Sequence, residues 1–138
     1  MSGRGRADPN RAKGLAFSDY DGTMLAAVAE ISLERTSGAI RVHHIWAAAD
    51  PGLVLQPDNS LSLIEGGLIF GVGMAPLRMN EAPELYVELM PSDTPPTGLG
   101  EISPIIAPAA IGNAFAALTG RRLRHLPMIP ERVLAAMT

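Results

Sequence analysis

The sequence predicts an α+β domain, with a small mixed sheet that starts with an N-terminal β-hairpin and carries two main helices on one face. Two runs of alternating apolar and polar residues, at about 24–34 and 40–48, flank Thr36-Ser37-Gly38, which is typical of a hairpin loop. Two later apolar stretches repeat every three to four residues and predict helices. A chain of 138 residues can form one domain with a buried core.

Three strands are expected before the first helix. The first is short, from Lys13 to Ser18, and is followed by a turn that ends at Gly22. In the second strand every other residue is apolar, and these residues share one face: Leu25, Ala27, Ala29, Ile31 and Leu33. Strict alternation in the third strand predicts a second such set, with His43 on the opposite face: Ile40, Val42, His44, Trp46 and Ala48.

The first predicted helix follows the breakers at 50–52 and 56–59. Asp58 or Asn59 is expected to cap it, and its apolar stripe is Leu61, Ile64, Leu68 and Val72. The helix also contains Gly66, Gly67 and Gly71, each of which costs about 1 kcal/mol relative to alanine. Close approach of a ligand or of another backbone explains such glycines, and core packing explains them equally well.

The remaining elements are a strand at 84–89, a loop, and two helices. Pro108 is predicted at the first position of the longer helix, whose buried stripe is Ile111, Phe115 and Leu118. Gly120 ends this helix, and a short final helix starts at Pro130.

Composition and charge narrow the classes of function. The chain has no cysteine, which excludes disulfides, thiolate metal sites and a cysteine nucleophile. Its three histidines lack the usual ligand spacing, so no metal site is predicted. A net charge of −3 does not favour nucleic acid as a partner. We expect residues 1–12 to form a flexible basic tail before a domain at 13–138, with no membrane-spanning stretch and a cytoplasmic location.

The most informative stretch is the loop Thr94-Pro95-Pro96-Thr97-Gly98-Leu99-Gly100-Glu101. Its prolines restrict the backbone, and its glycines permit sharp bends and close approach to a ligand. Glu101 lies just before a predicted helix, where the helix dipole favours a negative charge. A surface turn with a solvated glutamate would show the same local pattern.

Several segments, taken in order, resemble the carboxy-terminal part of the large subunit of molybdenum hydroxylases. This is the xanthine dehydrogenase and aldehyde oxidase family, and the type is that of the isoquinoline 1-oxidoreductase beta-subunit and aldehyde dehydrogenase. The resemblance runs from Lys13 almost to the end of the chain. It is carried by Gly14–Thr23, Glu30–Trp46, Asp50-Pro51-Gly52, Gln56-Pro57-Asp58-Asn59, Ile64-Glu65-Gly66-Gly67, Pro96–Glu101 and Ala114–Pro127.

The resemblance implies a molybdopterin-dinucleotide cofactor in the large subunit and an iron–sulfur partner subunit or domain. It implies that Glu101 is the catalytic base in the hydroxylation of an aldehyde or an N-heterocycle. General-base catalysis requires the pKa of such a carboxylate to lie near the working pH, which burial can achieve. The residues implied in cofactor binding are Glu65, Gly66, Gly67, Gly98 and Gly100.

The sequence also departs from the family pattern. Leu63 and Ile102 stand where the family usually has glutamine and proline, a segment before residue 84 is missing, and the upstream regions that supply most cofactor contacts are absent. We therefore expect the isolated chain to be inactive and to lack the cofactor. Two interpretations stay open. In the first, the chain contributes to oxidoreductase chemistry together with a partner, either the missing upstream large-subunit chain or another copy. In the second, it is a non-catalytic module that kept the fold and binds another protein or itself.

Overall fold

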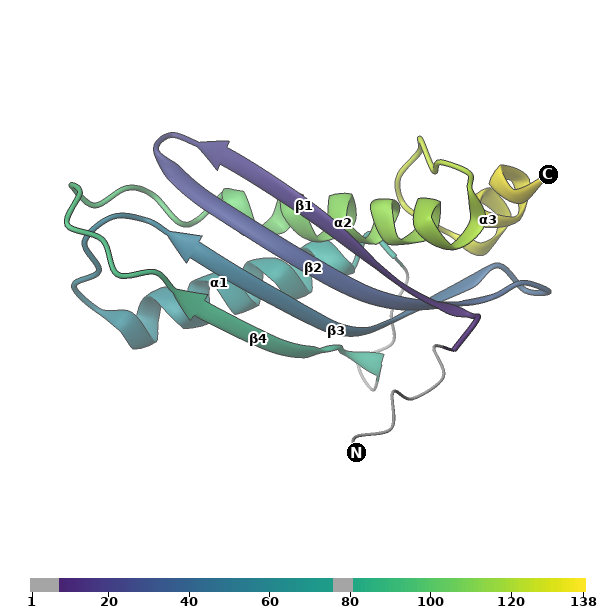
Figure 1. Cartoon of the computed structure of the whole chain (residues 1–138), viewed down its shortest axis with the longest axis horizontal. Coiled ribbons are helices and arrows are strands. Elements are labelled where there is room, and N and C mark those ends of the chain that lie inside the picture. The colour runs from purple at the N-terminus through teal and green to yellow at the C-terminus, as the bar shows by residue number, and fades with distance from the viewer. Residues whose placement is uncertain (1–7, 76–80) are drawn as a thin grey trace, which may run out of the picture.

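The computed structural model describes residues 8–75 and 81–138, and this part of the chain forms one four-stranded sheet and three helices (Figure 1). The elements are β1 (Arg11–Tyr20), β2 (Thr23–Glu34), β3 (Ala39–Asp50), α1 (Pro57–Val72), β4 (Glu84–Leu89), α2 (Ile102–Thr119) and α3 (Pro130–Met137). The strand order is β1-β2-β3-β4, antiparallel except for the parallel pair β3–β4. The predicted α+β class with a mixed sheet is confirmed.

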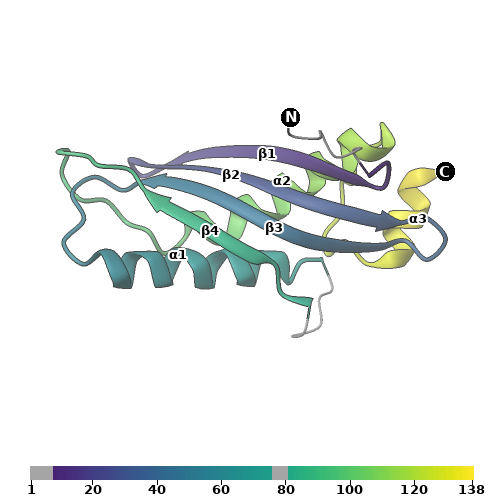
Figure 2. The ribbon, with the colours of Figure 1, turned by 60° about the horizontal axis from the view of Figure 1, so that its bottom comes forward.

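Helices α1 and α2 cover one face of the sheet, called here the inner face (Figure 2). The predicted apolar set on β2 points inward, and each of its five side chains is at most 3% exposed. The helix side chains that complete the core include Ile64 and Leu68 of α1 and Ile106, Ile111 and Phe115 of α2. The expected helix stripes are therefore buried against the sheet except at Leu61 and Leu118, which are half-buried.

The alternation predicted for β3 is confirmed for Ile40 and Val42 and is wrong from His44 onward, because β3 contains a β-bulge. Glu30 of β2 pairs with His44, but the next residue, Ile31, pairs with Val42, so His43 is the extra residue. The bulge shifts the inward positions of β3 by one residue. The buried side chains are Ile40, Val42, Ile45, Ala47 and Ala49.

The bulge also changes where the two histidines point. His43 Nε2 lies 2.7 Å from Ser32 Oγ, and His44 Nδ1 lies 3.2 Å from Glu30 Oε1. Ser32 and Glu30 are two residues apart on β2 and share its outer face. His43 and His44 therefore both lie on the outer face, and the prediction that they point in opposite directions is wrong.

Both main helices begin earlier than predicted. The N-cap of α1 is Gln56, without a side-chain hydrogen bond, so the prediction of Asp58 or Asn59 as the cap is wrong; Pro57 occupies the first turn. Helix α2 starts at Ile102, which places Pro108 in its interior and not at its first position. The apolar run before Pro108 carries the helix through this proline, because Ile102 and Ile106 are buried in the core.

Glycines in α1 allow close packing on α2. Because Pro108 has no N–H, the carbonyl of Pro104 lacks its usual helical donor. A Cβ at Gly71 would lie 2.4 Å from that carbonyl oxygen, so only glycine fits there. Gly67 is equally confined, whereas a Cβ at Gly66 would meet nothing within 4 Å. Close approach of another backbone explains Gly71, and close side-chain packing explains Gly67; neither accounts for Gly66.

Two further expectations differ in detail, and two others fall mainly on residues outside the described part of the chain. β1 begins at Arg11, two residues before the predicted start, and the predicted tail falls mainly on residues 1–7, which lie outside the described residues. Residues 76–80, in the region of the missing family segment, lie outside them too. Helix α2 is long and apolar enough to cross a membrane by length and composition, contrary to the expectation for this chain. Its packing against β1 and β2 identifies it as a core helix.

Candidate functional site

The loop between β4 and α2 packs against the connection that follows β3 (Figure 1). The backbone N–H of Thr97 donates to the carbonyl of Pro51 at 2.8 Å, and the Leu53 N–H donates to the carbonyl of Thr94 at 2.9 Å. Gly52 has a φ of +77°, and a Cβ there would lie 2.2 Å from the Pro95 oxygen. This connection therefore holds the proline-rich part of the loop in one place.

Two threonine hydroxyls fix the loop to the sheet. Thr23, the first residue of β2, is fully buried, and its hydroxyl donates to the carbonyl of Gly98 at 2.6 Å. The Thr23 hydroxyl oxygen also lies 2.6 Å from Thr97 Oγ1. The Thr97 hydroxyl in turn donates to the Pro51 carbonyl at 2.9 Å. A buried hydroxyl needs such partners, so Thr23 fixes the position of Gly98 and, through it, of the loop up to Gly100.

Glu101 is the N-cap residue of α2, and its side chain makes no capping hydrogen bond. It is exposed and interacts with Tyr20 at the end of β1. The hydrogen bond with the Glu101 carboxylate, and the charge of that carboxylate, raise the pKa of Tyr20. A carboxylate has more acceptor positions than one tyrosine O–H can occupy, so Glu101 can also accept from another proton donor.

The Glu65-Gly66-Gly67 stretch meets the start of α2. Glu65 and Gly66 lie on the exposed side of α1, whereas Gly67 faces Ser103. A Cβ at Gly67 would lie 2.1 Å from Ser103 Oγ. That oxygen is fully buried and has no hydrogen-bond partner within the described part of the chain. The two motifs predicted to bind cofactor are thus brought together at the first turn of α2.

The charges near this site are negative. Asp19 and Asp21 lie at the β1–β2 turn, and Asp93 lies in the loop. The described lysines and arginines belong to the other end of the sheet or to the residues after α2: Arg11, Lys13, Arg35, Arg41, Arg121, Arg122, Arg124 and Arg132. An anionic group at the loop would therefore be bound by backbone N–H groups and the α2 N-terminus.

A small cavity of about 310 Å³ lies beside the loop, between it and the residues after β3. Its lining is mostly apolar and includes Leu53, Val54 and Leu99, but neither Gly98, Gly100 nor Glu101. Of the predicted cofactor residues, Glu65, Gly66, Gly98 and Gly100 are exposed, whereas Gly67 packs against Ser103. In residues 8–75 and 81–138, no group of three or more histidine, aspartate or glutamate side chains could hold a metal ion.

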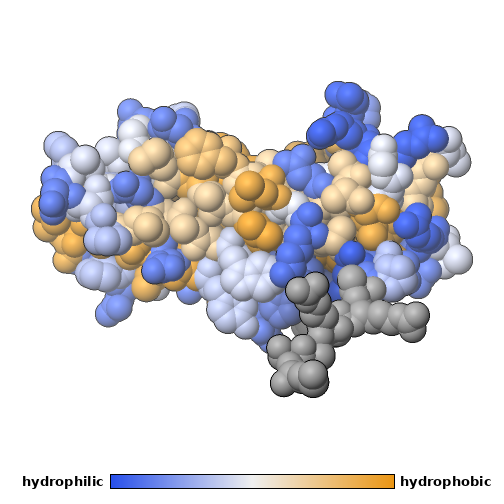
Figure 3. Space-filling view, in the orientation of Figure 1, coloured by the Kyte–Doolittle hydropathy of each residue, from blue (hydrophilic) through white to orange (hydrophobic). Residues whose placement is uncertain are grey.

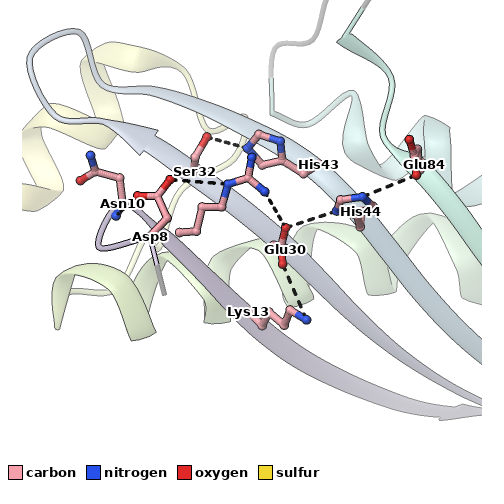
Figure 4. Close-up of polar contacts among 9 residues, drawn as sticks. Asp8, Asn10, Lys13, Glu30, Ser32, His43, His44 and Glu84 are labelled. Carbon is pink, nitrogen blue, oxygen red and sulfur yellow. Dashed lines mark hydrogen bonds and ion pairs between the residues drawn. The ribbon is translucent and has the colours of Figure 1, made fainter. Parts of the chain in front are cut away.

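A second polar cluster lies on the outer face of the sheet (Figure 4). Glu30 contacts two cationic side chains, Arg11 at 3.0 Å and Lys13 at 3.6 Å, and the imidazole of His44 at 3.2 Å. Burial alone would raise the pKa of Glu30, but the hydrogen bond with His44 and the charge of Lys13 outweigh it and lower the pKa. His44 also stacks on Trp46, with ring centroids 5.3 Å apart. This cluster stabilises the strands and lies apart from Glu101.

Sequence reasoning missed three residues of the site. Tyr20 was assigned only to a turn, Thr23 appeared only at the end of the Gly14–Thr23 segment of the family resemblance, and Ser103 received no role. Their partners, Glu101, Gly98 and Gly67, are between 36 and 81 positions away in the sequence. A polar residue that starts an otherwise apolar strand was the only local signal, and it pointed to Thr23.

Comparison with known proteins adds a family match and several similar proteins. Residues 2–78 match the family model described as the molybdopterin cofactor-binding domain. The chain is 34% identical to isoquinoline 1-oxidoreductase subunit beta of Brevundimonas diminuta, over 86% of this chain and 18% of that protein. It is 30% identical to the membrane-bound aldehyde dehydrogenase [pyrroloquinoline-quinone] of Gluconacetobacter polyoxogenes, over 80% of this chain and 17% of that protein.

Solved structures show the same fold. The aldehyde oxidoreductase from Desulfovibrio desulfuricans superposes with a TM-score of 0.75 and 26% identity, over 84% of this chain and 16% of that one. Quinoline 2-oxidoreductase from Pseudomonas putida 86 gives a TM-score of 0.73 at 21% identity, over 83% of this chain and 18% of that one, which shows the fold alone. The chain spans less than a fifth of the length of these relatives.

Proposed function

Because the chain belongs to the molybdopterin cofactor-binding domain family, we propose that it forms one wall of a molybdenum-hydroxylase active site. Polypeptide beyond these 138 residues supplies the rest of that site. The observation that carries this proposal is the meeting of Gly67 with the first turn of α2, directly after Glu101. The family resemblance drawn from the sequence is confirmed; the roles of the individual residues are part of the proposal.

The surface at the start of α2 fits one side of a large phosphate-bearing cofactor. At Gly66, Gly98 and Gly100 a Cβ would meet nothing within 4 Å, so bare backbone faces open space. Helix α2 begins without a side-chain cap, so its first N–H groups have no side-chain acceptor and can bind an anion. The unpartnered Ser103 hydroxyl lies in the same turn. These groups suit the pterin cofactor and, by family resemblance, its dinucleotide form.

When bound, the molybdenum cofactor supplies the redox chemistry that hydroxylates an aldehyde or N-heterocycle. In this proposal Glu101 accepts the proton at a carboxylate oxygen, while Tyr20 holds the other oxygen. Glu101 is exposed in this chain. A partner surface that covers it would remove water and raise its proton affinity toward the range that a general base needs.

The second candidate is a non-catalytic module that kept the fold and binds a partner or another copy. The absence of cationic side chains from the loop among the described residues favours it, since a bound dinucleotide carries several negative charges. The substrate, an iron–sulfur partner subunit and a cytoplasmic location follow from the family resemblance and the sequence alone, and they stay proposals.

A chimera separates the two candidates. This chain would replace the matching segment of the Brevundimonas diminuta beta subunit, produced in a host that makes the cofactor. We expect the chimera to retain molybdenum and to oxidise isoquinoline in a dye-linked assay, and Glu101→Gln to abolish turnover with molybdenum retained. Glu131→Gln, at an exposed position on α3, is the control and should keep activity. A chimera that folds and assembles but contains no molybdenum would favour the non-catalytic module.

A further inference from the structure

A groove on the far side of α2 from α1 joins an apolar floor to a basic rim. Its volume is about 390 Å³, within the range of roughly 300–1,000 Å³ found for small-molecule sites. The outward residues of α2 form one side, from Ile105 through Ala109 to Asn113. The segment between α2 and α3, which Figure 1 shows folding back beside the end of α2, forms the other side with Leu126 and Met128.

The second side of the groove is held in place. The Met128 N–H donates to the Met74 carbonyl at 2.6 Å, and the Arg132 guanidinium donates to the carbonyls of Leu126 and Pro127. Met128 is 4% exposed, and a Cβ at Gly112 of α2 would lie 3.8 Å from its terminal methyl carbon. The groove is therefore formed before any ligand arrives, which lowers the entropic cost of binding.

The floor exposes apolar side chains that a ligand would cover. Ile105 is 54% exposed and Leu126 is 50% exposed, and both line the groove. The span from Ile105 to Asn113 is eight residues of α-helix, or about 12 Å. That length suits an unbranched chain of medium length.

The rim is cationic. Arg122, Arg124 and His125 line the groove, and no carboxylate lines it. Within residues 8–75 and 81–138 neither arginine forms an ion pair with a carboxylate; Arg122 only donates to Asn113 Oδ1 at 3.4 Å. Two arginines without acidic partners beside an apolar floor complement a ligand with one anionic end and one apolar end.

We propose that this groove binds a medium-chain alkyl carboxylate. The alkyl chain lies along α2 between Ile105 and Leu126, and the carboxylate accepts hydrogen bonds from the guanidinium groups of Arg122 and Arg124. Because the groove shares no residue with the Glu101 loop, the proposal is independent of molybdenum chemistry.

The test uses octanoate as the probe and NMR of the ¹⁵N,¹³C-labelled chain. Octanoate should shift the Gly112 amide and the Met128 methyl signals along saturable curves, while 1-octanol and octyltrimethylammonium should bind at least about tenfold more weakly. Equal binding of 1-octanol would overturn the role of the arginines. No saturable shift up to about 1 mM octanoate would overturn the site itself.

Matched variants locate the charge. The double substitution Arg122→Gln/Arg124→Gln should weaken octanoate binding about tenfold or more. Arg121→Gln removes one charge from the same segment, but Arg121 does not line the groove, so affinity should change less than about twofold. If Arg121→Gln weakened binding as much as Arg122→Gln alone, a diffuse charge effect would replace the proposed site. Unchanged far-ultraviolet circular dichroism shows that the variants are folded.

Discussion

The two faces of the sheet use the same strands in opposite ways. On the inner face, Leu25 and Ile45 are fully buried under α1 and α2. On the outer face, Leu15, Phe17 and Tyr86 are between 51% and 64% exposed, and within the described residues no helix covers them (Figure 3). The outer face also carries polar side chains such as Glu30 and His44, but its apolar side chains stay exposed because no helix of the described residues packs on them. The outer face is the one that is available to another polypeptide.

The outer face is arranged in rows across the strands. One row is polar, Lys13–Glu30–His44–Glu84, and the next is apolar, Leu15–Val28–Trp46–Tyr86. The third row, Phe17–Ala26–Ala48–Glu88, has small residues at its centre. A groove of about 600 Å³ lies over these small residues. We propose that another polypeptide packs here, either a second copy of the chain or the rest of a large subunit. Light scattering of the chain at micromolar concentration tests the second copy, which predicts a mass above that of the monomer.

The largest difference is expected between two leucines on opposite faces. Leu25→Ala opens a cavity in the core and should lower the free energy of unfolding by about 2–5 kcal/mol. Leu15→Ala removes a side chain that is 61% exposed in the single chain, and it should change this free energy by no more than about 0.5 kcal/mol at a concentration where light scattering gives the monomer mass. Urea denaturation of both variants gives the two values. Similar losses for both would mean that the outer face is already covered in solution.

A second pair of substitutions compares confined and open positions of α1. Gly71→Ala forces a methyl group against the Pro104 carbonyl and should destabilise the chain by about 1–3 kcal/mol. Gly66→Ala meets open space and should stabilise it by up to about 1 kcal/mol, since alanine is the better helix former. Thermal unfolding of the two variants provides the comparison. A loss of stability for Gly66→Ala would contradict the open position assigned to Gly66.

The buried Thr23 hydroxyl should contribute less than a core side chain. Thr23→Val keeps the shape but leaves the Gly98 carbonyl without its donor, with an expected loss of about 1–2 kcal/mol. Thr94→Val in the exposed part of the same loop is the control and should be nearly neutral. Hydrogen exchange of the Leu99 and Gly100 amides should accelerate only for Thr23→Val. Unchanged exchange in both variants would remove Thr23 as the residue that positions the loop.

The smallest effect concerns the outer-face cluster. The pKa of Glu30 is lowered in the folded chain from its ordinary value of 4.5. The Glu30 carboxylate therefore adds stability at pH values above 4.5, and this contribution is lost as the pH falls through the folded-state pKa. The stability difference between the wild type and Glu30→Gln should therefore shrink between about pH 5 and pH 3. Denaturation curves across this range measure it. A difference that is independent of pH would show that the contacts of Glu30 add nothing through its charge.

Local patterns predicted most of the fold, and long-range contacts account for the failures. The alternation of β2 and the Thr36-Ser37-Gly38 turn gave the hairpin, because burial of one strand face repeats every two residues. The bulge at His43 was invisible, since it depends on how β3 pairs with β2. Pro108 was misplaced because burial of Ile102 and Ile106 outweighs the local cost of a proline inside α2.

The candidate site was predicted in part for the same reason. Glu101, Gly98 and Gly100 are marked by local sequence, and Glu101 lies directly before a helix as expected. The contacts of Glu101 with Tyr20, and of Gly67 with Ser103, join segments that the sequence alone does not bring together. The exposure of Glu101 could not be read from the sequence either, because it depends on which polypeptide lies next to the loop.

Metal analysis of the isolated chain tests the central claim most directly. The chain would be purified from a host that makes the cofactor, and its molybdenum content and its dye-linked oxidation of aldehydes would be measured. A single exposed wall with no nearby cationic side chain among the described residues cannot hold the cofactor, so we predict molybdenum far below one atom per chain and no turnover. One molybdenum per chain, with turnover that Glu101→Gln abolishes, would contradict the account and make this chain a complete site by itself.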